Sequence, residues 1–324
     1  MENSLTNKRK ISIDYTLIGL FVVLIILVVI FSFTTKYFFT YNNLLTILIS
    51  LSVLGIAAAS QTIVIISGGI DLSQESVLAV PGVIAAVLLG KGLPFFIVLI
   101  ISISIGPIVG LINGLIVTKV KINPIIVTLA MLGIVRGVLV LSVGPELIPI
   151  KDTRFTFLGT TPRFIWNIPF CIIIMIITFL FFHYLITYTL FGRRIYAVGG
   201  NPQAARFSGI NVDRIQIITY VINGTVGAIA GIVFAANIGW AVPIGGQGMI
   251  FKIVSAVFLG GALLGGGKGK IIGTVLGVAI IGIIGNGFVM LGFRLALELI
   301  LVGVILILAV ALGKVRMNRE NNII

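Results

Sequence analysis

The chain has 324 residues, of which 59% are hydrophobic and only 10% are charged, and its formal net charge is +13. A soluble domain carries about 25% charged residues, so the composition excludes a soluble globular protein and indicates an integral membrane protein. Basic residues fix the orientation of such proteins in the bilayer, and we therefore expect no nucleic-acid partner. The single cysteine, Cys171, excludes an intramolecular disulfide.

Uninterrupted apolar stretches of about 20 residues recur along the chain, and each can cross a bilayer core of roughly 30 Å as a helix. They predict an all-α membrane protein with about ten transmembrane helices in one domain (16–312), between an N-terminal tail (1–15) and a C-terminal tail (313–324). The eighth helix is short, which predicts that it is tilted, broken or shielded by protein. The predicted ranges are 16–33, 44–66, 72–90, 93–118, 124–143, 168–190, 215–237, 251–264, 271–291 and 295–312.

Basic residues are concentrated in alternate loops between these helices. When the N-terminal segment with Lys8, Arg9 and Lys10 is placed in the cytoplasm, the loops on the same side hold most of the remaining lysines and arginines. This asymmetry predicts that both termini are cytoplasmic. The residues on that side are Lys119, Lys121, Arg193, Arg194, Arg206, Arg214, Lys268, Lys270, Lys314, Arg316 and Arg319.

Two parts of the sequence carry motifs in the order of a known family. The first comprises "ISGGIDLSQESVLAVPGVIAAVLL" (66–89) and "INGLIVTKVKINPIIVTLAMLGIVRGV" (112–138). The second runs from "FGRRIYAVGGNPQAARFSGINVDRIQI" (191–217) to "VFLGGALLGGGKGKIIGTVLG" (257–277). Together they resemble the membrane permease of bacterial ABC importers of the ribose and simple-sugar family.

The resemblance implies a ten-helix permease in the bacterial cytoplasmic membrane, which forms the translocation pathway for a simple sugar. It also implies three kinds of partner: a cytoplasmic ATPase subunit that binds ATP and magnesium, a second permease copy in a homodimer or a heterodimer with a paralogue, and an extracytoplasmic sugar-binding protein. We therefore expect no cofactor on this chain. The sequence departs from the usual family residues at Gln74, Glu75, Ile250 and Lys252.

Asp71 and Glu75 are the only acidic residues between residues 15 and 145. Asp71 can cap the N-terminus of the helix 72–90, with Gln74 at the third helical position completing a capping box. Glu75 lies about one turn further on, on a similar face. A second hypothesis, compatible with the first, is that Asp71, Ser73, Gln74 and Glu75 face the translocation pathway or its cytoplasmic gate, where water reaches the acids.

Amide side chains within the predicted helices are further candidates for the pathway, because each amide can both donate to and accept from a sugar hydroxyl. Amides also bridge helices inside a bundle, where such hydrogen bonds contribute about 0.6 kcal/mol, and both interpretations stay open. The candidates are Gln61, Asn113, Asn223 and Asn286.

The long inner loop 191–214 resembles the coupling segment with which ABC permeases dock into a groove on the ATPase. Asn201 and Pro202 predict a helix start, Gln203–Arg206 a short helical run, and Gly209 its end. We expect the small Ala204 and Ala205 to let the segment sit deep in the groove and Arg206 to pair with an acid on the ATPase. The predicted coupling residues are Asn201, Pro202, Gln203, Ala204, Ala205, Arg206, Ser208 and Gly209.

The segment "GGALLGGGKGK" (260–270) resembles a phosphate-binding loop at first sight. A Walker A loop reads G-x-x-x-x-G-K-[ST], whereas this segment has Ala262 in place of the first glycine and Gly269 in place of the hydroxyl residue that holds magnesium. The sequence therefore predicts a tight cytoplasmic turn without nucleotide binding.

Neither a catalytic nor a metal-binding constellation is evident. The only histidine, His183, lies in a predicted helix, and the sequence contains no HExxH, CxxC or paired-aspartate motif. An alternative to the ABC permease is a stand-alone secondary carrier or facilitator for a small polar solute. Ion-coupled carriers usually place acids or histidines in mid-helix, and the absence of acids from the fourth to ninth predicted helices disfavours this alternative.

Overall fold

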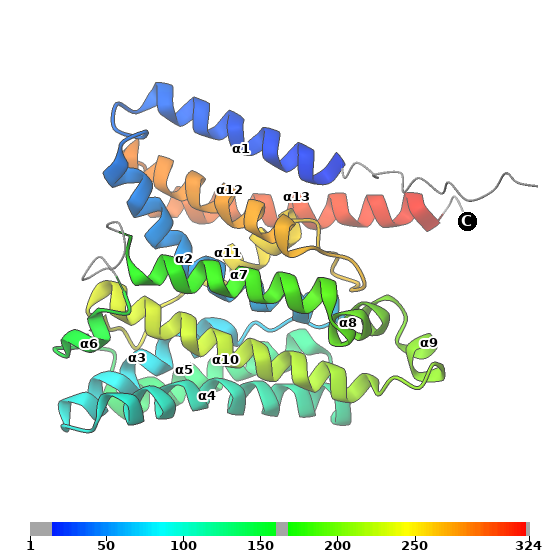
Figure 1. Ribbon diagram of the computed structural model, residues 1–324, viewed down its shortest axis with the longest axis horizontal. Coiled ribbons are helices and arrows are strands. Elements are labelled where there is room, and N and C mark those ends of the chain that lie inside the picture. Colours follow the sequence, from blue (N-terminus) through cyan, green and yellow to red (C-terminus); the bar gives the residue numbers. More distant parts are fainter. Residues whose placement is uncertain (1–14, 160–167, 322–324) are drawn as a thin grey trace, which may run out of the picture.

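The computed structural model describes residues 15–159 and 168–321, which form a bundle of helices and one short two-stranded ribbon (Figure 1). The helices are α1 (Tyr15–Thr34), α2 (Tyr41–Ile66), α3 (Gln74–Gly90), α4 (Phe95–Leu115) with its π-helical extension η1 (Ile116–Val120), α5 (Pro124–Val143), α6 (Thr153–Thr156), α7 (Phe170–Tyr188), α8 (Leu190–Gly200), α9 (Pro202–Phe207), α10 (Val212–Ile238), α11 (Met249–Leu259), α12 (Ile271–Met290) and α13 (Leu295–Asn321). The strands β1 (Ile148–Pro149) and β2 (Trp240–Ala241) pair antiparallel.

Each predicted apolar range overlaps one of these helices. Within the described residues, eight helices are long and apolar enough to cross a membrane, while α3 and α11 are apolar but shorter. The all-α membrane class is therefore confirmed, and the number of ten spans stays a prediction. The eighth predicted helix corresponds to α11, which has 11 residues and packs against α2, α12 and α13. Helix α13 continues to Asn321, through most of the segment predicted as a C-terminal tail.

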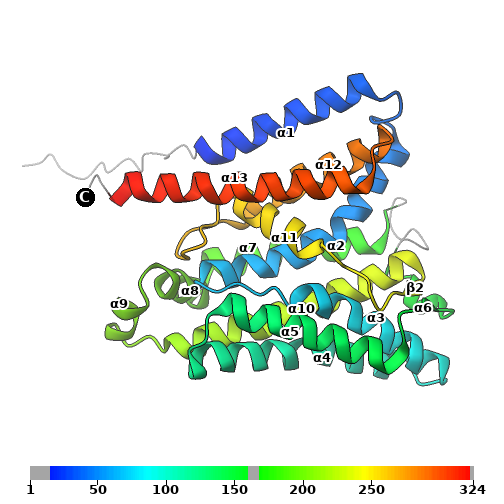
Figure 2. The same cartoon turned by 180° about the vertical axis from the view of Figure 1, so that it is seen from behind.

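The bundle has three layers in Figures 1 and 2. Helices α1, α12 and α13 form one outer layer, α2, α7 and α11 lie in the middle, and α3, α4, α5 and α10 form the opposite layer. Helix α2 contacts α7, α10, α11 and α12, and 89% of its most apolar window is buried, against 11% for α1. The core of the molecule therefore surrounds α2.

Glycines bring α4 and α10 into backbone contact. A Cβ atom on Gly106 would overlap the carbonyl oxygen of Gly224, and one on Gly110 would overlap that of Tyr220. Small residues spaced four apart let membrane helices approach closely and gain van der Waals contact, which is a main source of helix association in lipid. This packing explains why α10 forms the centre of its layer.

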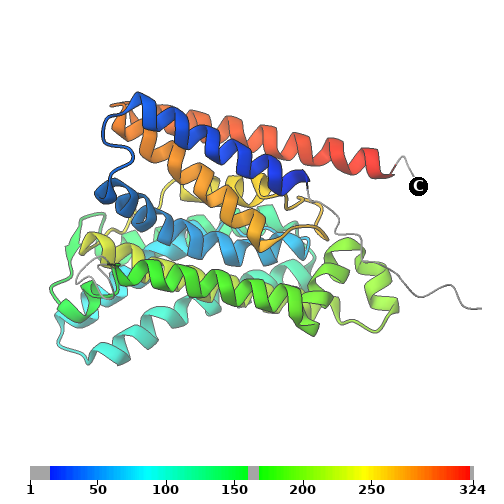
Figure 3. The same cartoon turned by 45° about the horizontal axis from the view of Figure 1, so that its top comes forward.

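The two ends of the bundle differ. Helices α8 and α9, the start of α1 and the C-terminal end of α13 lie at one end, here named the α9 end. Helix α6 and the β1–β2 ribbon lie at the opposite end, here named the α6 end. Figure 3 shows that the α8–α9 segment (yellow-green) extends from the bundle as a separate small unit. The first and last described residues are thus on the same side as α9.

Candidate functional site

Helix α9 has the local structure predicted for the coupling segment. Asn201 is its N-cap, and the side-chain oxygen of Asn201 accepts a hydrogen bond from the amide of Ala204 at 2.9 Å. Pro202 occupies the first turn, where its missing N–H group is not needed. The helix ends at Phe207, and Gly209 adopts a φ of +79°, which favours glycine. Sequence alone therefore predicts this short helix and both of its ends.

The predicted role of Ala205 in α9 needs correction, while that of Arg206 stays a prediction. Ala205 is only 4% exposed and packs in a cluster with Ile195, Val198 and Val212 of the same chain, so it does not face a partner. Arg206 is already paired within the chain, because its guanidinium lies 2.8 Å from the carboxylate of Asp213. The outward surface of α9 is formed by exposed Pro202, Gln203, Ala204, Arg206, Phe207 and Ser208.

Phe207 is the residue of this segment that the sequence interpretation missed. Its side chain is 93% exposed at the end of α9. A large aromatic side chain at a polar surface is typical of interface anchors, and a phenylalanine inside a short basic loop was a signal available in the sequence. Phe207 is thus the main apolar group that α9 presents outward.

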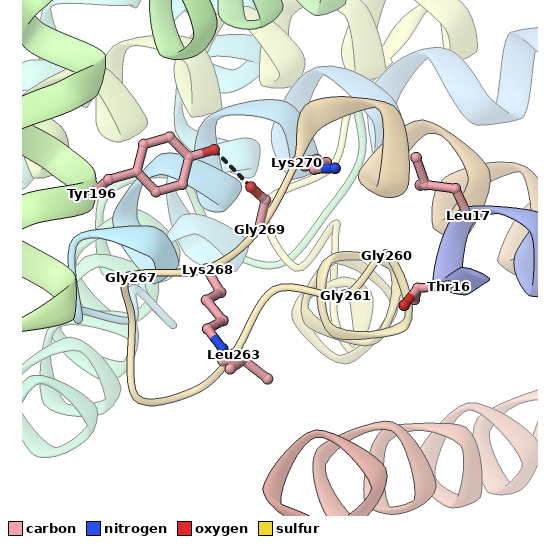
Figure 4. A pocket seen from close by; sticks show the side chains of 10 residues that line it. All are labelled: Thr16, Leu17, Tyr196, Gly260, Gly261, Leu263, Gly267, Lys268, Gly269 and Lys270. Carbon is pink, nitrogen blue, oxygen red and sulfur yellow. Dashed lines mark hydrogen bonds between the residues drawn. The ribbon is translucent and has the colours of Figure 1, made fainter. Parts of the chain in front are cut away.

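The glycine-rich segment 260–270 forms a turn beside α8, as Figure 4 shows. The hydroxyl group of Tyr196 donates a hydrogen bond to the carbonyl oxygen of Gly269 at 2.7 Å. Burial raises the pKa of the Tyr196 phenol, which keeps it protonated as a donor. The turn, Tyr196 and the start of α1 surround a cavity of about 430 Å³. The turn thus connects α8 with α11 and α12.

Three glycine segments meet at the α9 end. The amide of Gly267 donates a hydrogen bond to the carbonyl oxygen of Ile66, the last residue of α2, at 2.8 Å. A Cβ atom on Gly199, near the end of α8, would overlap the same carbonyl oxygen, and one on Gly266 would lie 2.8 Å from the Cα atom of Gly68. This glycine junction (66–68, 199–200 and 266–267) holds the end of α8 against the end of α2.

The segment that follows the glycine junction leads to a buried polar cluster around Asp71. The Oδ1 atom of Asp71 accepts hydrogen bonds from the amide and the hydroxyl of Ser73, at 3.0 and 2.6 Å. The Oδ2 atom accepts one from the Asn223 amide at 3.0 Å. Asn113 donates to Ser73 at 2.8 Å, and Asn223 also donates to Gln61 at 3.2 Å. The segment before α3 is thereby joined to α2, α4 and α10 through buried side chains.

The contacts of this cluster contradict part of each hypothesis about Asp71, namely the capping box and the access of water. The N-cap of α3 is Ser73, and its side chain makes no cap hydrogen bond, so the predicted capping box is not formed. Gln74 instead donates to Ser60 and Asn223, both at 3.1 Å. Asp71 is 1% exposed, and the expected access of water to it is wrong for this conformation. The predicted residues Gln61, Ser73, Gln74, Asn113 and Asn223 do come together, as a bridge between helices.

Glu75 belongs to a different site from Asp71. Its Oε2 atom accepts a hydrogen bond from the amide of Gly248, the N-cap of α11, at 3.0 Å. Its Oε1 atom lies 3.8 Å from the guanidinium of Arg136, which also donates to the carbonyl oxygens of Pro243 and Gly245, both at 2.8 Å. Glu75 and Arg136 thus fasten the loop before α11 to α3 and α5.

Asn286 also lies apart from the Asp71 cluster. It exchanges two hydrogen bonds with Asn43, at 2.9 and 3.0 Å, which join the first turn of α2 to the end of α12. These elements are at the α6 end of the bundle. Within residues 15–159 and 168–321, no three histidine, cysteine or acidic side chains gather in a way that could hold a metal ion.

Comparisons with known proteins show which family the sequence resembles. Residues 43–310 match the family described as "Branched-chain amino acid transport system / permease component". The chain is similar to the ribose import permease protein RbsC of Escherichia coli K12, with 37% identity over 89% of this chain and 91% of that protein. It is 34% identical to the D-allose transport system permease protein AlsC of the same organism, over 91% of each chain. It is 32% identical to the L-arabinose ABC transporter permease protein AraH of Azospirillum brasilense, over 93% of this chain and 88% of that protein. No solved structure matches the chain.

Proposed function

Because this chain belongs to the family of transport-system permease components, we propose that it forms the translocation pathway for a simple sugar in an ATP-driven importer of the bacterial cytoplasmic membrane. The observation that carries the proposal is the similarity over about nine-tenths of the chain to permeases named for ribose, D-allose and L-arabinose. The pathway takes a monosaccharide of this kind.

The α9 end is the cytoplasmic side of the protein. Helix α8, the glycine-rich turn and the C-terminal end of α13, whose sequences contain lysine or arginine, lie at this end, which follows the rule that cytoplasmic loops carry the excess of these residues. The eight long helices together with α3 and α11 make ten crossings, so that both termini are cytoplasmic. The α6 end then faces the outside of the membrane, where the sugar-binding protein delivers the solute.

The ATPase subunit docks on the outward surface of α9. An ATPase can drive the permease only if it contacts the two conformational states differently. The glycine junction keeps α8, which directly precedes α9, in backbone contact with α2. Phe207 inserts into a groove on the ATPase, with Gln203 and Ala204 beside it. ATP and magnesium bind to the ATPase, this chain binds no cofactor, and a second permease copy, identical or a paralogue, completes the pathway.

Reconstitution in liposomes tests this function. The chain should take up D-ribose, D-allose or L-arabinose only when the cognate ATPase, ATP and the sugar-binding protein are all present. The control replaces ATP by a non-hydrolysable analogue, which should abolish uptake. Equilibration of any of these sugars by the chain alone, without ATP, would contradict the proposal and identify a facilitator.

A further inference from the structure

A second cavity, of about 430 Å³, lies among α2, α10, α11, α12 and α13. It is built from the first half of α2, the second half of α12 and the first turns of α11 and α13. Because α2 and α13 begin at the α6 end, the cavity lies in the half of the bundle near that end. It is open to the surface of the chain, since Thr46 and Ser50 are exposed. Its polar lining residues are Thr46, Ser50, Asn237, Lys252, Asn286 and Glu298.

An ion pair forms part of the cavity wall. The ammonium group of Lys252, on the first turn of α11, contacts the carboxylate of Glu298, on the first turn of α13. The two side chains are 25% and 8% exposed. Gly285 of α12 makes room for the carboxylate, because a Cβ atom there would lie 2.7 Å from its Oε1 atom. The opposite charges cancel, so the polar part of a mostly apolar lining carries no net charge.

Lipid does not suit this surface. Charged side chains at membrane depth face a bundle interior or a water-filled cavity, because hydrocarbon cannot solvate them. Thr46 and Ser50 lie four residues apart, on one exposed face of α2. The buried Oδ1 atom of Asn237 has no hydrogen-bond partner among the described residues. A partly exposed ion pair, two hydroxyl side chains on one face of α2 and an unsatisfied acceptor together favour an aqueous or polar occupant beside the apolar part of the lining.

We propose that this cavity is the solute chamber of the permease and that it takes an uncharged polyhydroxylated solute. Hydroxyl groups of such a solute can bond to Ser50, Asn286 and the Lys252–Glu298 pair, and the C–H faces of its ring can lie on Leu54, Met249 and Ile281. Its volume is within the range of about 300–1,000 Å³ for small-molecule sites. The identity of the solute as a sugar rests on the proposed function, whereas access of water to the cavity does not.

Thiol labelling tests the chamber without reference to any solute. In proteoliposomes, Ser50→Cys should react with a cationic, membrane-impermeant methanethiosulfonate reagent at least tenfold faster than Val304→Cys. Val304 is a matched control, because it is 49% exposed and, like Ser50, is the tenth residue of a helix that begins at the α6 end. The cysteine thiolate attacks the sulfur of the reagent and displaces methanesulfinate, and the thiolate forms only where water reaches the thiol. The unchanged chain gives the background, since Cys171 is buried. Equally slow reaction of Ser50→Cys and Val304→Cys would overturn the inference.

Uptake by the assembled importer tests the route of the solute. Labelling of Ser50→Cys should reduce uptake of D-ribose, D-allose or L-arabinose at least tenfold, while the same treatment of the Val304→Cys importer should leave uptake unchanged. A labelled Ser50→Cys importer with full uptake would overturn the inference while leaving the proposed function intact. An importer that takes up none of the three sugars contradicts the proposed function, and the labelling rates still decide whether the cavity is open to water.

Discussion

The carbonyl oxygen of Ile66 accepts a hydrogen bond from the amide of Gly267 at 2.8 Å. This bond joins the glycine-rich turn to the last residue of α2, at the point where Gly199 of α8 packs against the same oxygen. The contacts are between backbones, which cannot yield as flexible side chains do. A shift of α8 towards α2 would therefore bring backbone atoms into overlap. The glycine-rich turn packs against both helices and fixes their relative position.

Gly199→Ala should destabilise the chain, whereas Gly200→Ala should not. A methyl group on Gly199 would overlap the carbonyl oxygen of Ile66 and lie 2.6 Å from the amide nitrogen of Gly267, while one on Gly200 would meet nothing within 4 Å. Overpacking of this kind costs about 1–3 kcal/mol. Thermal unfolding of both purified variants in one detergent measures the difference, and equal melting temperatures would contradict the tight glycine junction.

Phe207→Ala should weaken binding of the ATPase subunit without lowering the stability of the chain. The side chain is 93% exposed, and surface substitutions usually change stability by no more than about 0.5 kcal/mol. Loss of a central interface anchor costs about 2 kcal/mol or more, which is about thirtyfold in affinity. Titration of the detergent-solubilised permease with purified ATPase measures the affinity.

The control for Phe207→Ala is Phe96→Ala. Phe96 is also an exposed aromatic residue, at 76%, but it lies at the start of α4, away from α9. Its removal should leave the affinity for the ATPase unchanged. If Phe207→Ala binds the ATPase as tightly as Phe96→Ala does, the tip of α9 is not the docking point.

Ala205→Glu and Ala204→Glu should act by different mechanisms. Ala205 is buried within its own chain and Ala204 is exposed, so Ala205→Glu buries an unpaired charge, which costs about 3–5 kcal/mol. We expect a lower melting temperature and yield for Ala205→Glu. Ala204→Glu should keep the melting temperature and reduce only ATPase binding. A stable Ala205→Glu chain would show that Ala205 faces the partner, as the sequence first suggested.

Asp71→Asn should destabilise the chain, and the double variant Asp71→Asn/Asn223→Asp should recover much of the loss. In the single variant the new amide group faces the Asn223 amide, donor to donor, and Asn223 cannot rotate because its oxygen accepts from Ser60 and Gln74. An unsatisfied buried polar group costs about 1–3 kcal/mol.

In the double variant a carboxylate at position 223 accepts from the amide at position 71. Gln61 can rotate its Nε2 atom, which has no partner among the described residues, towards the new carboxylate. Thermal unfolding of the single and double variants measures the coupling. Additive losses from Asp71→Asn and Asn223→Asp would contradict the hydrogen-bonded cluster.

Local signals in the sequence were sufficient for the long helices and for the short helix α9. The apolar stretches predicted every long helix because crossing a bilayer requires about 20 consecutive apolar residues. The start of α9 at Asn201 and Pro202 and its end before Gly209 were predicted because capping depends on residues a few positions apart. The Asp71 capping box failed for the opposite reason, since Gln74 bonds to Ser60 and Asn223, which are distant in sequence.

The sequence by itself determined the membrane class, the family and the position of each apolar helix, because length, apolarity and motif order are read along the chain. Only the tertiary structure decided which face each helix buries. Membrane helices are apolar almost all round, so their periodicity does not distinguish the buried face from the lipid-facing one. Hence the separation of Glu75 from Asp71 and the pairing of Lys252 with Glu298 follow from helix packing between residues far apart in sequence.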